Sequence, residues 1–127
     1  MVKRVRLAYG KEGLWIELPD GPDIEVVEPR FVPGLPDERE AILRALREPI
    51  GSPPLKELVK PDDTVAIVFS DITRPQPRRP MLSVLLDELG HVPREQIVLI
   101  NALGTHRPNS EEELSEMLGP EIVSRYR

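Results

Sequence analysis

The sequence predicts an α/β fold, namely a Rossmann-like three-layer fragment with a mainly parallel central sheet and an N-terminal antiparallel β-meander. Residues 65–69 and 97–100 are continuous apolar runs, typical of strands buried on both faces. A helical pattern lies between them, which gives residues 64–101 the length of a right-handed βαβ unit. We therefore expect two parallel strands that are close neighbours.

Composition sets limits on the class of protein. The 127 residues are expected to form a single domain, with a β-meander at 3–28 and an α/β portion at 37–127. The net charge of −5 argues against a nucleic-acid-binding module. No apolar run approaches the roughly 20 residues that span a bilayer, and no signal peptide is recognisable, so we expect a cytoplasmic protein with no membrane partner.

Two further features of composition are informative. The absence of cysteine excludes disulfides, thiolate metal sites and cysteine nucleophiles. Fifteen prolines stiffen the loops, and together with the abundant charged residues they resemble the usage of thermophilic proteins. A melting temperature in the range of ordinary mesophilic domains would contradict this hypothesis.

The N-terminal region is expected to form strands. Residues 4–9 and 14–18 alternate apolar and polar side chains and are separated by a loop with glycine at both ends. Residues 23–28 follow a proline- and glycine-rich turn and predict a third short strand. The meander could lie at the edge of the main sheet or form a sheet of its own.

Helical patterns precede the first apolar run. Residues 37–48 predict a helix with Ile42, Ala45 and Leu46 on its apolar face, ended by the following proline. Residues 53–59 predict a short helix, with Ser52 as its N-cap and a proline at its first position.

The remaining elements alternate in an α/β order. The strand at 64–69 leads to a helix at 80–89 that ends at Gly90, and the second strand covers 96–101. The helix residues expected to face the sheet are Met81, Leu82, Leu85, Leu86 and Leu89. Asn109 or Ser110 caps the next helix with a glutamate three residues on, and Gly119 ends it. A further helical turn begins at Pro120 without a closing signal, so we expect a fragment of a longer protein.

Polar side chains follow both buried strands. They are Asp71, Thr73 and Arg74 after the first strand, and Gly104, Thr105 and His106 after the second. Ligands of open α/β sheets bind outside the carboxyl ends of the strands. If the strands are adjacent their ends lie about 5 Å apart, or about 10 Å with one strand between them. Arg74 and His106 are then expected to share a crevice.

These residue types suit a small hydroxy or keto acid. The fork of Arg74 matches a carboxylate, and His106 could move a proton at the oxygen of the neighbouring carbon. Asp71 could orient Arg74 or a substrate hydroxyl. Gly104 would allow close backbone approach, and Thr73 and Thr105 could donate to an anion.

Structural interpretations stand beside these functional ones. One structural interpretation is that Asp71 and Thr73 close an Asx-type turn, and another is that Arg74 pairs with Asp71 and does nothing else. We interpret Arg78-Arg79 as a solvated helix start and His91 as a solvated helix-terminus residue. With two histidines and no cysteine, the chain alone cannot supply a histidine-rich metal site, and common glycine-rich nucleotide motifs are absent.

Five motifs in one order strongly resemble the N-terminal part of the nickel-dependent lactate racemase family. They are Tyr9–Gly13, Phe31–Pro36, Pro49–Leu55, Ser70–Pro75 and Gly104–Pro108. The resemblance implies an enzyme that interconverts the stereoisomers of lactate or a related 2-hydroxy acid. In this family a histidine deprotonates the substrate hydroxyl while hydride passes to a nickel-pincer nucleotide, and a second histidine completes the symmetric chemistry.

The resemblance also implies residue roles. His106 matches one of the two catalytic histidines, Arg74 a substrate-contacting arginine, and Asp71 a neighbouring carboxylate. The second histidine, the lysine that tethers the cofactor and the nickel-coordinating histidine would lie beyond Arg127, so no metal ligand is expected within this chain. We therefore expect the isolated chain to bind no cofactor and to be inactive, its partners being the remainder of the enzyme and lactate or a similar acid.

Two other interpretations remain open. The same crevice could belong to a non-catalytic module that binds a carboxylate or phosphate, or the chain could be a structural fragment with an empty crevice. The sequence does not identify the hydroxy acid or the oligomeric state.

Overall fold

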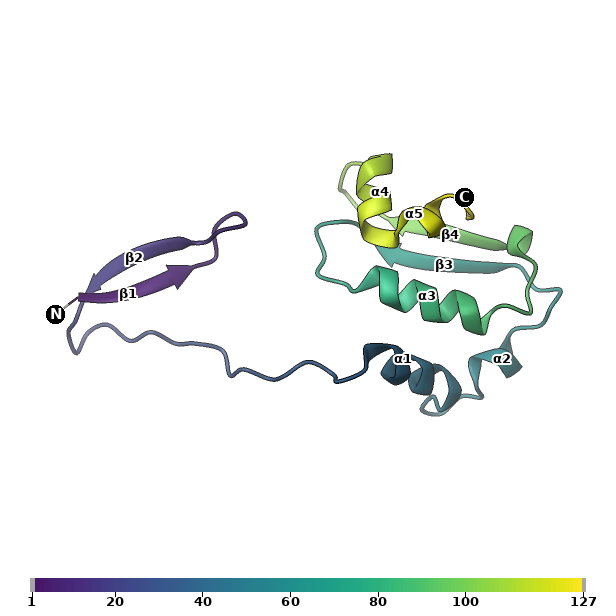
Figure 1. The fold of residues 1–127 in the computed structure, drawn as a ribbon, viewed down its shortest axis with the longest axis horizontal. Helices are drawn as coiled ribbons and strands as arrows, with labels where there is room; N and C mark the ends of the chain where they lie inside the picture. The colour runs from purple at the N-terminus through teal and green to yellow at the C-terminus, as the bar shows by residue number, and fades with distance from the viewer. Residues whose placement is uncertain (1, 127) are drawn as a thin grey trace. The chain divides into compact units, whose positions relative to one another are not determined.

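The computed structural model describes residues 2–126 (Figure 1). The chain divides into two compact units, the first ending at Gly34 and the second beginning at Leu35, and each is described by itself. Each unit contains a two-stranded sheet, and the two sheets are separate.

The first unit is a β-hairpin. Strands β1 (Val2–Leu7) and β2 (Leu14–Pro19) pair antiparallel, from Val2 opposite Pro19 to Leu7 opposite Leu14. The predicted strand at 23–28 is absent from this sheet, so the expected meander is a two-stranded hairpin. After β2, the Ile24 amide donates to the Gly21 carbonyl and closes a turn. The residues that follow this turn, up to residue 28, are not paired in a strand.

The second unit carries the predicted α/β order. Its elements are α1 (Glu38–Arg47), α2 (Leu55–Leu58), β3 (Val65–Ser70), α3 (Arg78–Glu88), the 3-10 turn η1 (Arg94–Gln96), β4 (Ile97–Ala102), α4 (Glu111–Leu118) and α5 (Pro120–Val123). Strands β3 and β4 are parallel and adjacent, with Ser70 level with Ala102 at their carboxyl ends. The prediction of neighbouring parallel strands is confirmed.

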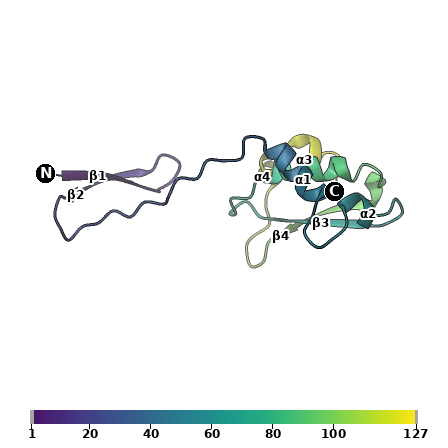
Figure 2. The same ribbon diagram turned by 90° about the horizontal axis from the view of Figure 1, so that it is seen from below.

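The helices cover one face of this sheet (Figure 2). Phe69 and Ile97 point into the core, whereas Val68 is 61% exposed and Ile100 45% exposed on the other face. The expected burial of both strand faces, and with it the three-layer arrangement, is not found among the described residues. Side chains alternate between a packed and an open face because all the described helices pack on the same side.

The core lies between the sheet and the helices behind it. It consists of Phe69, Leu82, Leu86, Leu89, Val92, Ile97, Met117, Leu118 and Ile122. Three of the five α3 residues predicted to face the sheet are therefore central, and Leu85 packs at the margin. Met81 was predicted among them but is exposed, and Ala45 is exposed on α1.

The predicted capping is found at α4 but not at α2, where Pro54 occupies the N-cap position without a side-chain cap and the Ser52 hydroxyl instead donates to the Pro53 carbonyl at 3.2 Å. The Asp37 carboxylate accepts a hydrogen bond from the Glu40 amide at the start of α1. Of the two candidate caps for α4, Ser110 is the one used, in a reciprocal capping box with Glu113. Gly119 ends α4 with a φ of 92°, a conformation that favours glycine.

Helix α1 packs against α3 and is joined to it by ion pairs. Arg39 pairs with Asp87 at 2.8 Å, and Arg47 pairs with the buried Glu88 at 2.9 Å. The hydrogen bond from Arg47 lowers the pKa of Glu88 against the opposing effect of burial. No helix within residues 2–126 combines the length and apolar character needed to cross a membrane.

Candidate active site

Asp71 lies at the centre of the polar residues that follow the two strands. It is the first residue after β3 and is only 4% exposed. Its Oδ1 accepts hydrogen bonds from the Thr73 amide at 2.8 Å and the Thr73 hydroxyl at 2.6 Å. Its Oδ2 lies 2.9 Å from Nδ1 of His106, which follows β4. One carboxylate thus joins the loops after both strands.

A tight turn after β4 positions His106. The His106 amide donates to the Leu103 carbonyl at 3.0 Å, and Gly104 occupies the second position of this turn with a φ of 60°. An added Cβ at Gly104 would meet nothing within 4 Å, so the turn requires glycine for its backbone conformation. The imidazole at the end of the turn is partly accessible, with 40% of its side-chain surface exposed.

The Asp71 contact decides which imidazole nitrogen is available. Hydrogen bonds from the Thr73 hydroxyl and then the Thr73 amide hold the pKa of Asp71 far below its ordinary value, with a smaller contribution from His106. Because an ionised carboxylate only accepts hydrogen bonds, Nδ1 of His106 must be the donor. In the neutral imidazole Nε2 then carries a lone pair and can accept a proton.

Arg78, the first residue of α3, stabilises the loop that carries Asp71 through hydrogen bonds to its backbone. Arg78 is only 6% exposed, and its guanidinium donates to the carbonyl oxygens of Ser70, Asp71, Arg74 and Gln76. The predicted solvated helix start is therefore wrong for Arg78 and right for Arg79, which is exposed and pairs with Glu121 at 2.9 Å.

The loop that carries His106 is tied to the start of α4. Arg107 donates two hydrogen bonds to Glu113, from Nη2 to Oε1 at 2.7 Å and from Nη1 to Oε2 at 2.9 Å. The Asn109 side chain and the Ser110 amide also donate to this carboxylate, each at 2.9 Å. These contacts, with the one from Arg107 largest, lower the pKa of Glu113 to about 2.

The remaining predicted site residues are more exposed. The amide of Arg74 donates to the Asp71 carbonyl at 3.2 Å, but within residues 2–126 its guanidinium makes no hydrogen bond or ion pair. The interpretation that Arg74 pairs with Asp71 is therefore wrong, whereas the Asx-type turn between Asp71 and Thr73 is present. Thr73 uses its hydroxyl hydrogen on Asp71, and Thr105 is exposed in the turn before His106.

The structure thus joins both Thr73 and His106 to Asp71 by hydrogen bonds, whereas the Arg74 guanidinium makes no hydrogen bond or ion pair within residues 2–126. His91 lies elsewhere and is not a solvated terminus residue, since its Nε2 lies 2.8 Å from the Val59 carbonyl and the contact is partly buried. No cluster of three or more potential metal-ligating His, Asp or Glu residues occurs in the described part of the chain.

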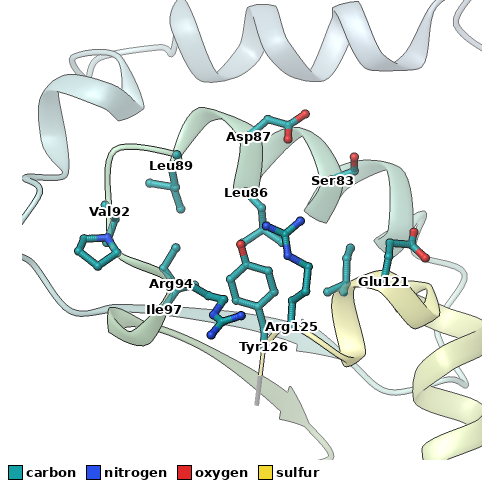
Figure 3. Close-up of a pocket in the computed structure, with 13 residues that line it drawn as sticks. Ser83, Leu86, Asp87, Leu89, Val92, Arg94, Ile97, Glu121, Arg125 and Tyr126 are labelled. Carbon is teal, nitrogen blue, oxygen red and sulfur yellow. The ribbon is translucent and has the colours of Figure 1, made fainter.

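A cavity elsewhere in the second unit does not coincide with this cluster. It has a volume of about 580 Å³, and Figure 3 shows Arg94, Arg125 and Tyr126 among the side chains that line it. Ile97, the first residue of β4, also lines it, so the cavity lies at the amino end of the strand, whereas His106 follows the carboxyl end. We place the candidate site by its hydrogen bonds, because Asp71 and His106 form a specific acid–base pair and the cavity contains none of its members.

Sequence reasoning missed the contributions of Gln76 and Arg78. The Gln76 side-chain oxygen accepts from the Ser70 hydroxyl at 2.6 Å and lies 3.2 Å from the Ser70 amide. The only signal in the sequence was that Gln76 and Arg78 lie in or next to a polar loop interrupted by Pro75 and Pro77. The carbonyl groups of such a loop are not paired within a helix or strand, and a nearby arginine is a suitable donor to them.

Comparisons with known proteins agree on one family. The family model described as the lactate racemase N-terminal domain matches residues 9–127. A lactate racemase from Lactiplantibacillus plantarum is 39% identical over 88 residues, which cover 68% of this chain and 21% of that protein. A lactate racemase from Thermoanaerobacterium thermosaccharolyticum is 29% identical over 123 residues, covering 94% of this chain and 29% of that protein.

A solved structure gives the same result. The lactate racemase apoprotein from Thermoanaerobacterium thermosaccharolyticum superposes with a TM-score of 0.78 at 28% sequence identity, covering 98% of this chain and 29% of that one. The chain therefore spans less than a third of the length of these relatives.

Proposed function

Since the chain belongs to the family of lactate racemase N-terminal domains, we propose that it supplies one half of an active site that racemises lactate or a related 2-hydroxy acid. The observation that carries this proposal is the 2.9 Å contact between Asp71 Oδ2 and His106 Nδ1 at the carboxyl ends of two parallel strands. The pair has the geometry of a histidine base held by a carboxylate.

The proposed step for this chain is a proton transfer. Nε2 of His106 accepts the proton of the substrate hydroxyl, so that an O–H bond breaks and an N–H bond forms. The ionised Asp71 stabilises the imidazolium that results and prevents the ring from rotating. In the reverse direction the same nitrogen returns the proton to the oxygen, as microscopic reversibility requires.

Arg74 is the proposed anchor for the substrate carboxylate. It is exposed three residues after Asp71, and its planar fork can donate two parallel hydrogen bonds to a carboxylate. Because Arg74 follows Asp71 by three residues on the loop, its guanidinium can bind the substrate carboxylate without breaking the Asp71–His106 contact. Thr105, exposed beside His106, is a further candidate donor.

We further propose that residues 2–126 do not hold a nickel-pincer nucleotide by themselves. They contain no cluster of three potential metal-ligating side chains, and the only histidines are His91, which contacts a backbone carbonyl, and His106, which is held by Asp71. In this proposal, hydride exchange with such a cofactor belongs to parts of the enzyme that residues 2–126 do not include. The isolated chain is accordingly expected to show no lactate racemisation.

A non-catalytic carboxylate- or phosphate-binding module is the less favoured alternative. The contact between Asp71 Oδ2 and His106 Nδ1 favours a proton-transfer site, because anion binding alone needs no histidine that is held with Nε2 available. The negative charge of Asp71 suits a base that must accept a proton, because it stabilises the imidazolium.

The experiment that tests the proposal is lactate racemisation by the complete, cofactor-loaded enzyme that contains this chain. We expect His106→Gln to lower kcat by about 10²- to 10⁴-fold, the usual contribution of a general base. The matched control is His91→Gln, which changes the other histidine and is expected to leave kcat close to wild type. Equal activity in wild type and His106→Gln would overturn the proposal.

A further inference from the structure

Arg78 is a buried cation whose hydrogen-bond donors are satisfied mainly by backbone carbonyl groups. No ion pair in the described part of the chain includes it, although it is only 6% exposed. Nε donates to the Ser70 carbonyl at 2.7 Å, and Nη1 donates to the Gln76 carbonyl at 3.2 Å. A buried guanidinium must have its donors satisfied, and here the loop at 70–76 satisfies them.

Nη2 makes the contacts that concern Asp71 most directly. It donates to the Asp71 carbonyl, lies 2.7 Å from the Arg74 carbonyl and lies 3.1 Å from the Ser70 hydroxyl. Nη2 carries two hydrogens for these three oxygens, so at least one hydrogen is shared between two oxygens. The carbonyl groups of the loop are thereby turned inward around a single guanidinium.

These contacts fix the backbone on both sides of the Asp71 side chain. The Ser70 carbonyl belongs to the peptide group before Asp71, and the Asp71 carbonyl belongs to the peptide group after it. Holding both peptide planes sets the direction of the Asp71 Cα–Cβ bond. That direction decides whether Oδ2 reaches Nδ1 of His106 on the neighbouring loop.

We propose that Arg78 is a positioning residue that holds His106 in its working tautomer by fixing the backbone of the Asp71 loop. This inference rests on the proposed function, in which Nε2 of His106 is the base. Within residues 2–126 Arg78 makes no hydrogen bond to His106, so it acts on the histidine through the Asp71 loop. A lysine cannot reproduce its effect, because an ammonium group is a point donor and cannot span oxygens that surround a planar fork.

The adjacent Arg79 provides a matched control. It occupies the next position of α3, but it is exposed and its guanidinium donates to Glu121 on α5. Arg78→Gln and Arg79→Gln therefore remove the same group from neighbouring positions. Only the first removes it from the Asp71 loop.

The test is the ¹⁵N spectrum of the histidine side chains in the 127-residue chain, in mildly alkaline solution. In the wild type we expect His106 to be protonated at Nδ1 and unprotonated at Nε2. In Arg78→Gln and Arg78→Lys we expect a shift towards protonation at Nε2, the tautomer that a free imidazole in water prefers. Arg79→Gln should retain the wild-type spectrum, and backbone amide spectra establish that each variant is folded.

The outcomes separate this proposal from the proposed function. An Nε2-protonated His106 in the wild type would contradict the proposed function itself. A wild-type tautomer in both folded Arg78 variants would overturn the positioning role alone, as would an equal shift in Arg79→Gln. Unfolding of both Arg78 variants would assign the residue to fold stability and would also overturn the proposal.

Discussion

Asp71 and His106 are 35 residues apart in the sequence, and their side chains meet at 2.9 Å where β3 and β4 end. The contact is possible because the strands are parallel, adjacent and level at their carboxyl ends. It converts two separate polar loops into one acid–base pair.

Asp71→Asn should impair proton transfer while leaving the fold intact. Asparagine keeps the shape of the side chain, but it removes the charge that stabilises the imidazolium and permits the wrong tautomer of His106. We expect kcat for lactate racemisation by the complete, loaded enzyme to fall by about 10²- to 10⁴-fold. Steady-state kinetics with each lactate enantiomer would measure the loss.

The control for this change is Asp87→Asn on α3. Asp87 is an exposed aspartate that pairs with Arg39, so its loss removes an equal charge away from the site. It should leave kcat near the wild-type value. Equal losses in the two variants would show that the Asp71 effect is not specific.

Thr73→Val should raise the pKa of Asp71. The Thr73 hydroxyl is the largest cause of the lowered pKa, and valine removes it while keeping a similar shape. The Thr73 amide and His106 remain, so the pKa should rise but stay below its ordinary value. Carboxyl ¹³C shifts followed through an acid titration measure it. An unchanged Asp71 titration in Thr73→Val would contradict this account, and Thr105→Val serves as the control.

Glu113 should make the stability of the chain depend on acid pH. Its pKa is lowered from 4.5 to about 2, chiefly by the hydrogen bond from Arg107. A group with a depressed folded-state pKa stabilises the fold above its unfolded pKa, and this contribution is lost as the pH falls through the folded pKa. The wild type should therefore exceed Glu113→Gln in stability above about pH 4.5, with the difference shrinking between about 4.5 and 2.

Urea unfolding midpoints measured across this pH range would test the effect. The control is Glu116→Gln, an exposed glutamate on the same helix. A stability difference between wild type and Glu113→Gln that stays constant from neutral pH to pH 2 would be inconsistent with the lowered pKa.

Leu89→Ala should destabilise the second unit strongly. Leu89 is almost fully buried and belongs to the core between α3 and the sheet, so its truncation leaves a cavity. We expect a loss of about 2–5 kcal/mol in the free energy of unfolding. Leu58→Ala, at an exposed position of α2, should cost much less. Similar denaturation midpoints for the two variants would argue against the described core.

Much of the second unit could be predicted from the sequence because its signals are local. The apolar runs and the Ser110–Glu113 capping box each act within a few residues, whereas Ser52, the predicted N-cap of α2, does not cap that helix. The one-sided burial of the sheet could not be predicted. Val68 and Ile100 are as apolar as the inward-facing residues, so the pattern alone does not reveal that their face is open.

The candidate site was predicted only in part. The position of the two polar loops after buried strands predicted a crevice shared by Arg74 and His106. The contact in the structure joins Asp71 to His106 instead, and it depends on long-range geometry that no local pattern contains. The role of Arg78 was hidden for the same reason. A pair of arginines at a helix start is usually solvated, and only the folded loop shows that one of them is enclosed by carbonyl groups.

The central claim is that Asp71 holds His106 with Nδ1 protonated and Nε2 available as a base. The most direct measurement is the ¹⁵N spectrum of the His106 side chain in the wild-type chain and in Asp71→Asn. We predict that Nδ1 carries the proton in the wild type and that Asp71→Asn loses this preference. A wild-type His106 protonated at Nε2, or a tautomer that does not change in Asp71→Asn, would contradict the account.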